Sequence, residues 1–570
     1  MSIFVLSKTQ KYRHVGYHFF QIHKNSNQDV TGVQPFFKKE IMILLQNISF
    51  GFPGGDLLFN NTNLTIPSDT KSALVGSNGT GKSTLLKIIA GEIQPLSGNS
   101  TIPGHIFYVP QMFGNFNHLT IAECLKIDQK LNALQKITNG EVDEIYFEIL
   151  NDDWDIEERC QQALEYWGLD NFELTQKLES LSGGQKTKVF LAGIQINPPD
   201  IIILDEPTNH LDIEGRKLLY DLIDKTNASV VIVSHDRNLL NLVDIIFELS
   251  NQGITTYGGN YDFYTEQKEV EKEALHNDIH TKEKALKKAK EKERETLERK
   301  QKLDARGKGK QEKSGVARIM MNTLRNNAEK NTSKLKSVHA EKISGISGNL
   351  RDLRSSLKNA EQMKVNFNDS NLHSGKILVD AENINFNYGM EKLWKENVSL
   401  EVRSGDRISV KGSNGSGKTT LIKVLLGNIE PSEGKISRAE FNSIYIDQEY
   451  SLIDNDSSLY DFVQTFNDSA LQESEVKTLL SRFLFGKNTW DKKCGVLSGG
   501  ERLRLLLCGL SISNNTPDMI ILDEPTNNLD LQNVKILTNS VKDYHGTLLV
   551  ISHDEVFLEE IGVDSEVLLD

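Results

Sequence analysis

The sequence predicts an α/β protein of two similar domains in tandem, joined by a long α-helical hairpin. Four blocks of sequence occur twice in the same order, more than 300 residues apart, which indicates a tandem duplication. Within each copy, strand-length apolar runs alternate with helical patterns, as in parallel α/β domains. The region between the copies is rich in Glu, Lys, Arg, Ala and Leu and predicts long helices.

The chain divides into four predicted segments. Residues 1–41 are an atypical extension, with neither a long apolar core nor a small-residue cleavage site, so they do not fit a signal peptide. We expect that translation starts at Met42 or that 1–41 is a disordered lead. Residues 42–260 form the first domain, 261–372 the helical linker and 373–570 the second domain.

The composition is that of a soluble globular protein, with 38% hydrophobic and 25% charged residues. The sequence contains no run of about 18 apolar residues, which argues against a transmembrane span. Four cysteines without paired spacing argue against a disulfide framework, a zinc site or an iron–sulfur cluster. We therefore expect a reducing, cytoplasmic location.

Two stretches satisfy the phosphate-loop pattern G-x-x-x-x-G-K-[ST]: "GSNGTGKS" at 76–83 and "GSNGSGKT" at 412–419. Each follows an apolar strand and precedes a helical pattern, so the glycines can turn backbone N–H groups toward phosphate oxygens. The lysines should reach the β- and γ-phosphates of a nucleotide. A glycine turn before a helix is the alternative, which two matches with all their partners disfavour. The predicted phosphate-binding residues are Gly76, Ser77, Asn78, Gly79, Thr80, Gly81, Lys82, Ser83 and Thr84, and Gly412, Ser413, Asn414, Gly415, Ser416, Gly417, Lys418, Thr419 and Thr420.

Acidic and histidine residues end the buried strands of both copies, in "ILDEP" and "SHD". An aspartate at the end of an apolar strand is well placed to orient Mg²⁺. The glutamate after it can orient the attacking water or accept its proton, and the histidine can contact the γ-phosphate. The predicted catalytic residues are Glu206, Glu524, His235 and His553.

Glutamines and aromatic residues complete each predicted site. The glutamines of "YVPQ" and "YIDQ" can sense the metal or the water. The predicted metal-binding residues are Ser83, Gln111, Asp205, Thr419, Gln448 and Asp523. Phe52 and Tyr388 precede the loops and can stack on adenine, with packing in the core as the alternative.

Two further segments, "LSGGQ" and "LSGGE", open helical patterns. A Ser-Gly-Gly turn at a helix N-terminus can offer hydroxyl and N–H donors to a γ-phosphate across an interface. The residues concerned are Ser182, Gly183, Gly184, Gln185, Ser498, Gly499, Gly500 and Glu501.

The linker predicts an antiparallel helical hairpin. Residues 265–305 contain no proline or glycine, 306–315 read as a break, and a second helical stretch runs from about 316 to 360. An arm of about 40 residues would extend about 60 Å. Residues 299–325 carry a net charge of +7, although the whole chain carries −14. The predicted RNA-binding residues are Arg306, Lys308, Lys310, Lys313, Arg318 and Arg325.

Two interpretations of the linker compete. A solvated spacer between the domains would need fewer residues and no order, and would not explain the charge at the turn. A probe inserted into a polyanion explains both, and compact RNA presents negative channels that are read by shape. Met320, Met321 and Leu324 either belong to the hairpin core or contact the partner.

The order of phosphate loop, glutamine, "LSGG", "ILDEP" and "SHD" resembles the nucleotide-binding domain of ATP-binding-cassette (ABC) proteins, over nearly all of 42–258 and 376–570. The resemblance implies that the two domains close head to tail on two ATP molecules with Mg²⁺. The Lys82 loop would then face 498–501, and the Lys418 loop would face 182–185.

Two cassettes, no membrane domain and a charged linker together resemble the F subfamily (ABC-F). The resemblance implies an ATPase that binds the ribosomal exit site, with its linker tip on rRNA and peptidyl-tRNA, and acts as a translation factor or an antibiotic protection factor. It also implies a monomer that closes on itself. A peripheral ATPase of an ABC transporter is the alternative. Gln111 lies 71 residues before Ser182, against 50 for Gln448 and Ser498, so we expect a small insertion in the first domain.

Overall fold

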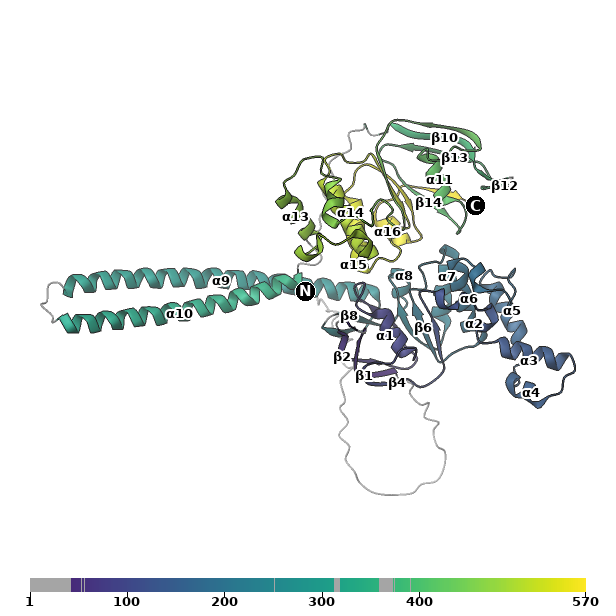
Figure 1. The fold of residues 1–570 in the computed structure, drawn as a ribbon, viewed down its shortest axis with the longest axis horizontal. Helices are drawn as coiled ribbons and strands as arrows, with labels where there is room; N and C mark the ends of the chain where they lie inside the picture. Colours follow the sequence, from purple (N-terminus) through teal and green to yellow (C-terminus); the bar gives the residue numbers. More distant parts are fainter. Residues whose placement is uncertain are drawn as a thin grey trace, which may run out of the picture. The chain divides into compact units, whose positions relative to one another are not determined.

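The computed structural model describes residues 43–569, apart from 53, 56, 251, 312–317, 358–372, 374 and 390. The predicted extension 1–41 therefore lies outside the described residues. Two similar α/β halves are present, and a pair of long helices lies between them in the sequence (Figure 1). The predicted fold class is confirmed.

The first half contains a parallel sheet whose last strand is antiparallel. Its described strands are, in spatial order, β5 (Ile106–Val109), β6 (Ile201–Asp205), β7 (Ser229–Val233), β3 (Lys71–Val75), β8 (Ile245–Ser250) and β9 (Gly253–Tyr257). A separate antiparallel sheet consists of β2 (Leu57–Ile66), β1 (Ile43–Gly51) and β4 (Ser97–Thr101). The phosphate-loop strand β3 thus lies inside the parallel sheet.

Continuous apolar strands form the centre of this half because both faces of the parallel sheet are covered. Every residue of β6 is buried. Successive side chains of a strand point to opposite faces, so Ile202 and Leu204 enter the core beneath the helices, while Ile201 and Ile203 enter the core that contains the antiparallel sheet. The helices of this half are α1 (Lys82–Ile89), α2 (Ile121–Cys124), α3 (Asp128–Thr138), α4 (Glu144–Leu150), α5 (Ile156–Tyr166), α6 (Gly183–Ile196), α7 (Ile213–Lys225) and α8 (Arg237–Leu240).

The extra length of the first half corresponds to α3 and α4, which pack against each other beside α5 (Figure 1). Asp153 joins this insertion to α5. Its carboxylate accepts from Lys130 of α3 at 2.6 Å and from Arg159 of α5 at 2.7 Å. The insertion is therefore a short helical pair, attached by these ion pairs and by Ala133 and Leu150, which are buried in the core of the first half.

The second half repeats this plan. Its parallel sheet consists of β16 (Ser443–Ile446), β17 (Met519–Asp523), β18 (Thr547–Ile551), β14 (Arg407–Gly412) and β19 (Ser565–Leu569). An antiparallel sheet of β13 (Val398–Arg403), β10 (Ile377–Asn385) and β15 (Glu433–Arg438) lies apart from it, with a short hairpin of β11 (Asn387–Tyr388) and β12 (Glu391–Lys392). The helices are α11 (Lys418–Leu425), α12 (Leu459–Gln464), α13 (Glu473–Arg482), α14 (Gly499–Ile512), α15 (Leu531–Lys542) and α16 (Glu555–Glu560).

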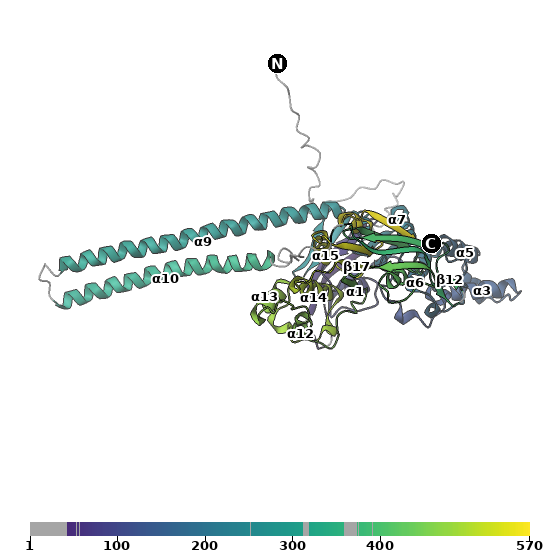
Figure 2. The same cartoon turned by 90° about the horizontal axis from the view of Figure 1, so that it is seen from above.

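The linker forms two long helices, α9 (Tyr261–Gln311) and α10 (Arg318–Leu357), which run side by side in both views (Figures 1 and 2). Leu350 and Ile279 are buried between them, and Arg354 of α10 pairs with Glu283 of α9. One expectation was wrong: α9 continues to Gln311, so the predicted break at 306–315 does not begin at residue 306. Strong helix formers around two isolated glycines keep that stretch helical.

The base of α9 is attached to the first half through Glu248 of β8. Its carboxylate accepts from Tyr257 at 3.2 Å, from Tyr264 at 3.3 Å and from Lys268 at 3.0 Å. Glu248 pairs in register with Val75, the last residue before the first phosphate loop. The hairpin thus begins one strand away from a predicted nucleotide site.

Candidate nucleotide sites

The first phosphate loop joins β3 to α1 and needs glycine at two positions. Gly81 precedes α1 with a φ of 94°, in the left-handed region that favours glycine. A Cβ atom on Gly76 would lie 2.4 Å from the carbonyl oxygen of Leu249. In the second half, Gly417 takes the same place before α11, with a φ of 86°. Both loops therefore have the backbone path that the motif predicts.

Each loop lysine donates to carbonyl groups of its own loop. Lys82 Nζ lies 2.8 Å from the Gly76 oxygen and 3.1 Å from the Ser77 oxygen. Lys418 Nζ makes the equivalent two bonds at 2.9 and 2.8 Å. Burial lowers the pKa of both lysines, against the pull of nearby carboxylates. A cation is thus held above each loop, where it can receive a phosphate.

A hydroxyl and a carboxylate pair at the start of each loop helix. Ser83 Oγ donates to Asp205 Oδ1 at 3.0 Å, and Thr419 Oγ1 donates to Asp523 Oδ2 at 3.1 Å. The aspartates end β6 and β17, and in each sheet one strand, β7 or β18, lies between the aspartate strand and the strand that carries the loop. Residues far apart in sequence meet because the carboxyl ends of parallel strands share one edge of the sheet.

Two tyrosines complete these pairs and were missed by the sequence argument. Tyr445 OH donates to Asp523 Oδ2 at 2.8 Å, and Tyr108 OH donates to Asp205 Oδ2 at 3.4 Å. The signal was present in "YVPQ" and "YIDQ", because the tyrosine in each stands on the strand next to the aspartate strand. Burial raises the pKa of both tyrosines, so they remain donors.

Tyr445→Phe is expected to destabilise the second half by about 1.5–3 kcal/mol, because it removes a hydrogen bond to a carboxylate. Tyr108→Phe is the matched control, and its longer bond predicts a smaller loss. Scanning calorimetry of both variants measures the two changes. Equal changes would contradict the unequal strength inferred from the distances.

The catalytic candidates form a glutamate–histidine pair in each half. His235 Nε2 lies 3.1 Å from Glu206 Oε1, and His553 Nε2 lies 3.2 Å from Glu524 Oε1. Both glutamates have left-handed backbones, with φ of 49° and 48°. This backbone conformation is strained for any residue other than glycine, and such strain is typical of functional sites.

Burial dominates the electrostatics of these pairs. It raises the pKa of Glu206, and it raises that of Glu524 to about 7. It lowers the pKa of His235 to about 3 and that of His553 to about 4. The histidines are therefore neutral at pH 7, and each glutamate is a carboxyl group whose proton affinity suits a general base.

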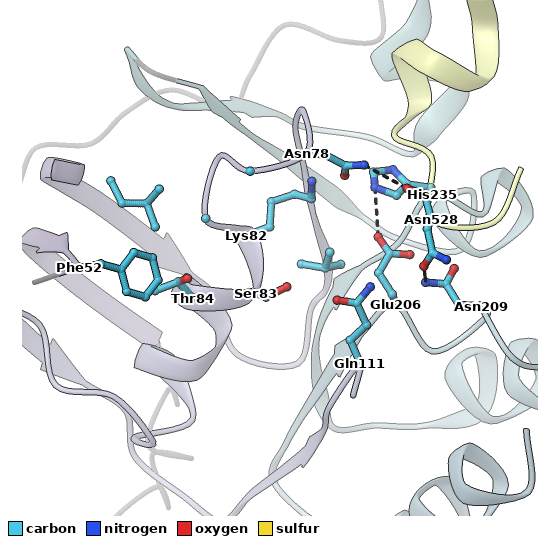
Figure 3. Close-up of a pocket in the computed structure, with 14 residues that line it drawn as sticks. Phe52, Asn78, Lys82, Ser83, Thr84, Gln111, Glu206, Asn209, His235 and Asn528 are labelled. Atoms are coloured by element: carbon cyan, nitrogen blue, oxygen red, sulfur yellow. Dashed lines mark hydrogen bonds and ion pairs between the residues drawn. The ribbon is translucent and has the colours of Figure 1, made fainter. Parts of the chain in front are cut away.

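A cavity of about 380 Å³ joins the predicted residues of the first half (Figure 3). Figure 3 shows Phe52 on one side of Lys82 and the Glu206–His235 pair on the other. The predicted residues that line it are Phe52, Asn78, Gly79, Gly81, Lys82, Ser83, Thr84, Gln111, Glu206 and His235. Phe52 is 58% exposed, so packing in the core does not explain it.

The second half places its counterparts in a similar order. Tyr388 is 64% exposed, and its hydroxyl lies 3.2 Å from Thr420 Oγ1 of α11. Gln448 is exposed after β16, and its side chain does not reach the Thr419–Asp523 pair within hydrogen-bonding distance. The role of Gln448 stays a prediction.

The two halves meet through their phosphate loops and the segments after "ILDEP". The Asn78 backbone N–H donates to Asp530 at 2.9 Å, and its side chain donates to the Asn528 oxygen at 3.0 Å. Asn414 donates in turn to the His210 oxygen at 3.0 Å. The three acceptor residues, Asp530, Asn528 and His210, follow "ILDEP" in their halves and were not among the predicted site residues.

Both "LSGG" segments cap their helices, α6 and α14. Ser182 forms a capping box with Gln185, and Ser498 forms one with Glu501. A Cβ on Gly184 would lie 3.3 Å from the Asn414 side chain, so the first segment adjoins the second loop. The segment 498–501 does not line the cavity at Lys82, and its facing that loop stays a prediction.

Apart from Lys313, the RNA-binding candidates belong to the C-terminal end of α9 and the N-terminal part of α10, two helices that Figure 2 shows side by side. Arg306 is exposed on α9. Lys313 lies outside the described residues, and only the backbone is described for Lys308, Lys310, Arg318 and Arg325, as for Met320, Met321 and Leu324. Their contact with RNA stays a prediction.

Two phosphate-loop domains that meet across their loops define a class of tandem nucleotide-binding protein. Comparison with known proteins places the chain within that class. The family described as ABC transporter matches residues 59–209 and 395–527. Putative ATP-binding protein YdiF of Bacillus subtilis (strain 168) is 31% identical over 92% of this chain and 79% of its own. ABC transporter F family member 5 of Arabidopsis thaliana is 29% identical over 94% of this chain and 75% of its own.

The chain belongs to the ABC-F family of ATP-binding-cassette proteins. The solved structure of RNase-L Inhibitor has a similar fold, with a TM-score of 0.54 and 19% identity over 91% of this chain and 87% of its own. Archaeal ribosome recycling factor aABCE1, solved with ribosomal stalk protein aP1, has a TM-score of 0.52 at 19% identity and covers 90% of this chain and 86% of its own. In the described part of the chain, no helix combines the length and hydropathy of a membrane-spanning segment.

Proposed function

We propose that this protein is an ATPase that binds two ATP molecules between its halves and acts on the ribosome from the cytoplasm. The observation that carries the proposal is a complete set of loop lysine, hydroxyl–carboxylate pair and glutamate–histidine pair in each half. We further propose the division into 42–260, 261–372 and 373–570 as two ATP-binding domains and a linker.

The hydroxyl–carboxylate pairs fit Mg²⁺. Oxygen donors are the ligands that this ion prefers, and each pair lies beside its loop lysine at the start of the loop helix. Ser83 with Asp205, and Thr419 with Asp523, would hold the ion, with Gln111 and Gln448 nearby. When bound, the ion supplies charge neutralisation for the phosphate oxygens.

The chain's own residues account for the rest of the chemistry. Each loop lysine leaves its loop carbonyls and binds the β- and γ-phosphates. The loop N–H groups and the "LSGG" helix N-termini bind phosphate from two sides, and Phe52 and Tyr388 stack on adenine. Each glutamate, left-handed at the end of a strand, orients the attacking water and accepts its proton. The neighbouring histidine contacts the γ-phosphate.

Closure of the halves on ATP links this chemistry to the linker. The interdomain contacts of Asn78 and Asn414 come from the loops themselves, so a nucleotide in a loop alters them directly. The hairpin base is joined through Glu248 to the strand beside the first loop strand. ATP binding would therefore position the hairpin, and its basic end would enter ribosomal RNA and contact peptidyl-tRNA.

The test uses a chain in which Glu206 and Glu524 are both glutamine. With ATP, this variant should sediment with ribosomes in low-salt gradients, because closure is no longer reversed by hydrolysis. Neutralising Arg306, Lys308 and Lys310 together in the same variant should weaken this association several-fold while ATP still binds. Neutralising Lys217, Lys225 and Lys395 is the matched control.

Two outcomes would contradict the ribosomal role. One is a hydrolysis-blocked variant that runs free of ribosomes with ATP bound. The other is co-purification with membranes and an integral partner, which a transporter ATPase would show. Drug sensitivity of cells that express the protein then separates an antibiotic protection factor from a translation factor.

A further inference from the structure

Arg216 is a buried cation of the first half that lies at the second nucleotide site. It belongs to the first turn of α7, and the residue is only 8% exposed. Its Nη1 atom donates to Asp236 Oδ2 at 3.3 Å and to the backbone oxygen of His553 at 3.4 Å, while Nε donates to the Leu211 oxygen at 3.3 Å. The guanidinium group therefore connects two elements of its own half with the catalytic histidine of the other half.

The guanidinium group is held in place from its own half. Asp236 Oδ2, which accepts from Arg216, also accepts from Tyr220 OH at 2.7 Å. Asp236 Oδ1 caps the N-terminus of α8 by accepting from the backbone N–H groups of Asn238 and Leu239. A carboxylate fixed in this way gives the arginine a single orientation toward the interface.

The second site makes fewer internal hydrogen bonds than the first. In the first site, His235 Nε2 and Glu206 Oε1 interact, and the buried atoms left unpaired are Glu206 Oε2 and His235 Nδ1. In the second site, His553 Nε2 and Glu524 Oε1 are 3.2 Å apart but outside hydrogen-bond geometry, so both ring nitrogens of His553 and both carboxylate oxygens of Glu524 are buried without a side-chain hydrogen-bond partner. The Glu524–His553 pair is thus held less firmly by its own hydrogen bonds than the Glu206–His235 pair.

Arg216 places a cation at the second site through its hydrogen bond to the His553 backbone oxygen. Counting from the aspartates Asp212 and Asp530 that cap α7 and α15, the residue equivalent to Arg216 is Val534.

We propose that Arg216 is a positioning residue for the second ATP site, supplied in trans by the first half. Its cation fixes the His553 backbone and stands next to the Glu524–His553 pair, so the second site is competent only while the halves are together. At the first site the equivalent position of the other half is Val534, so this site works without an arginine supplied there in trans. The two sites therefore have different rates and different dependence on closure. This inference rests on the ATPase function proposed above.

The test measures each site alone. Glu206→Gln leaves the second site active, and Glu524→Gln leaves the first. In the first background, Arg216→Met is expected to lower kcat about tenfold, since misplacing a catalytic group by a fraction of an ångström has effects of this order. Directly measured ATP affinity should change less than about twofold, and Arg216→Lys should restore part of the rate. In the second background the decrease should be several times smaller.

Lys217→Met, on the exposed neighbouring position, is the matched loss of charge, and thermal unfolding checks that each variant folds. Equal decreases in the two backgrounds would overturn the proposal, because they would indicate general damage to the interface. A weaker ATP affinity with unchanged kcat would also overturn it. If neither parent background hydrolyses ATP, the ATPase function itself fails; if only the Glu206→Gln parent is inactive, the ATPase function stands and the trans role falls.

Discussion

Changing Glu206 and Glu524 together to glutamine is expected to lower the rate of ATP hydrolysis by about 10²–10⁴-fold, the usual contribution of a general base. Glutamine preserves the size of the side chain and can still orient a water molecule, but it cannot accept the proton. ATP binding should persist because lysines, hydroxyls and loop N–H groups are unchanged. Phosphate release and equilibrium ATP binding measure the two quantities separately.

The single variants sharpen this prediction. Each should retain the activity of the other site, so neither alone should approach the loss of the pair. Glu214→Gln with Glu555→Gln is the matched control, because these two residues are also acidic, stand in the first turns of α7 and α16, and lie outside the cavity. A double variant that kept more than a tenth of the wild-type rate would show that another group accepts the proton.

The structural consequence of the same variant is compaction. Hydrolysis normally removes the γ-phosphate that joins a loop of one half to the helix N-terminus of the other. Without hydrolysis, ATP should hold the halves together, and solution scattering should show a smaller radius of gyration with ATP than without it. An unchanged radius of gyration would show that nucleotide binding does not cause domain closure, and it would contradict the proposed mechanism.

Local motifs predicted the parts of the fold and site that depend on backbone rules. Phosphate loops and buried strands are readable because glycine and β-branched runs each serve one local geometry. The alternation of Ile201–Ile203 with Ile202–Leu204 between two cores follows from the strand period alone. Nothing beyond the neighbouring residues is needed for such predictions.

Contacts that depend on tertiary placement were not predictable in this way. Tyr445 and Arg216 reach carboxylates on other strands or the backbone of the other half, and no spacing in the sequence encodes those distances. Val338 and Leu350 are both apolar residues of α10, yet Val338 is 60% exposed while Leu350 is buried. The helix periodicity identifies a face, but the partner helix decides where along that face contact occurs.

Among the substitutions considered in the second half, Trp394→Ala is expected to have the largest effect on stability. Its side chain is 1% exposed, and its indole N–H donates to the Ser416 oxygen at 3.0 Å, which fixes the second phosphate loop from below. Trp394→Ala should lower the free energy of unfolding by about 3–5 kcal/mol, through lost burial and a cavity. It also leaves the Ser416 carbonyl without this donor, so ATP affinity at the second site should decrease with stability.

Calorimetry of the nucleotide-free protein measures this effect. For a half of this size, we expect the Tm of the second half to decrease by about 10 °C. Trp394→Phe is the informative control, because a phenylalanine packs at the equivalent place under the first loop. A Cβ atom on Gly81 would lie 2.6 Å from the Phe59 ring, and a Cβ atom on Gly417 would lie 2.9 Å from the Trp394 indole nitrogen. Phenylalanine should therefore recover most of the stability but not the hydrogen bond. If Trp394→Phe lowered the stability as much as Trp394→Ala, the hydrogen bond of the indole N–H would contribute more to stability than burial of the ring. The second loop would then be stabilised mainly by a hydrogen bond and the first by apolar packing.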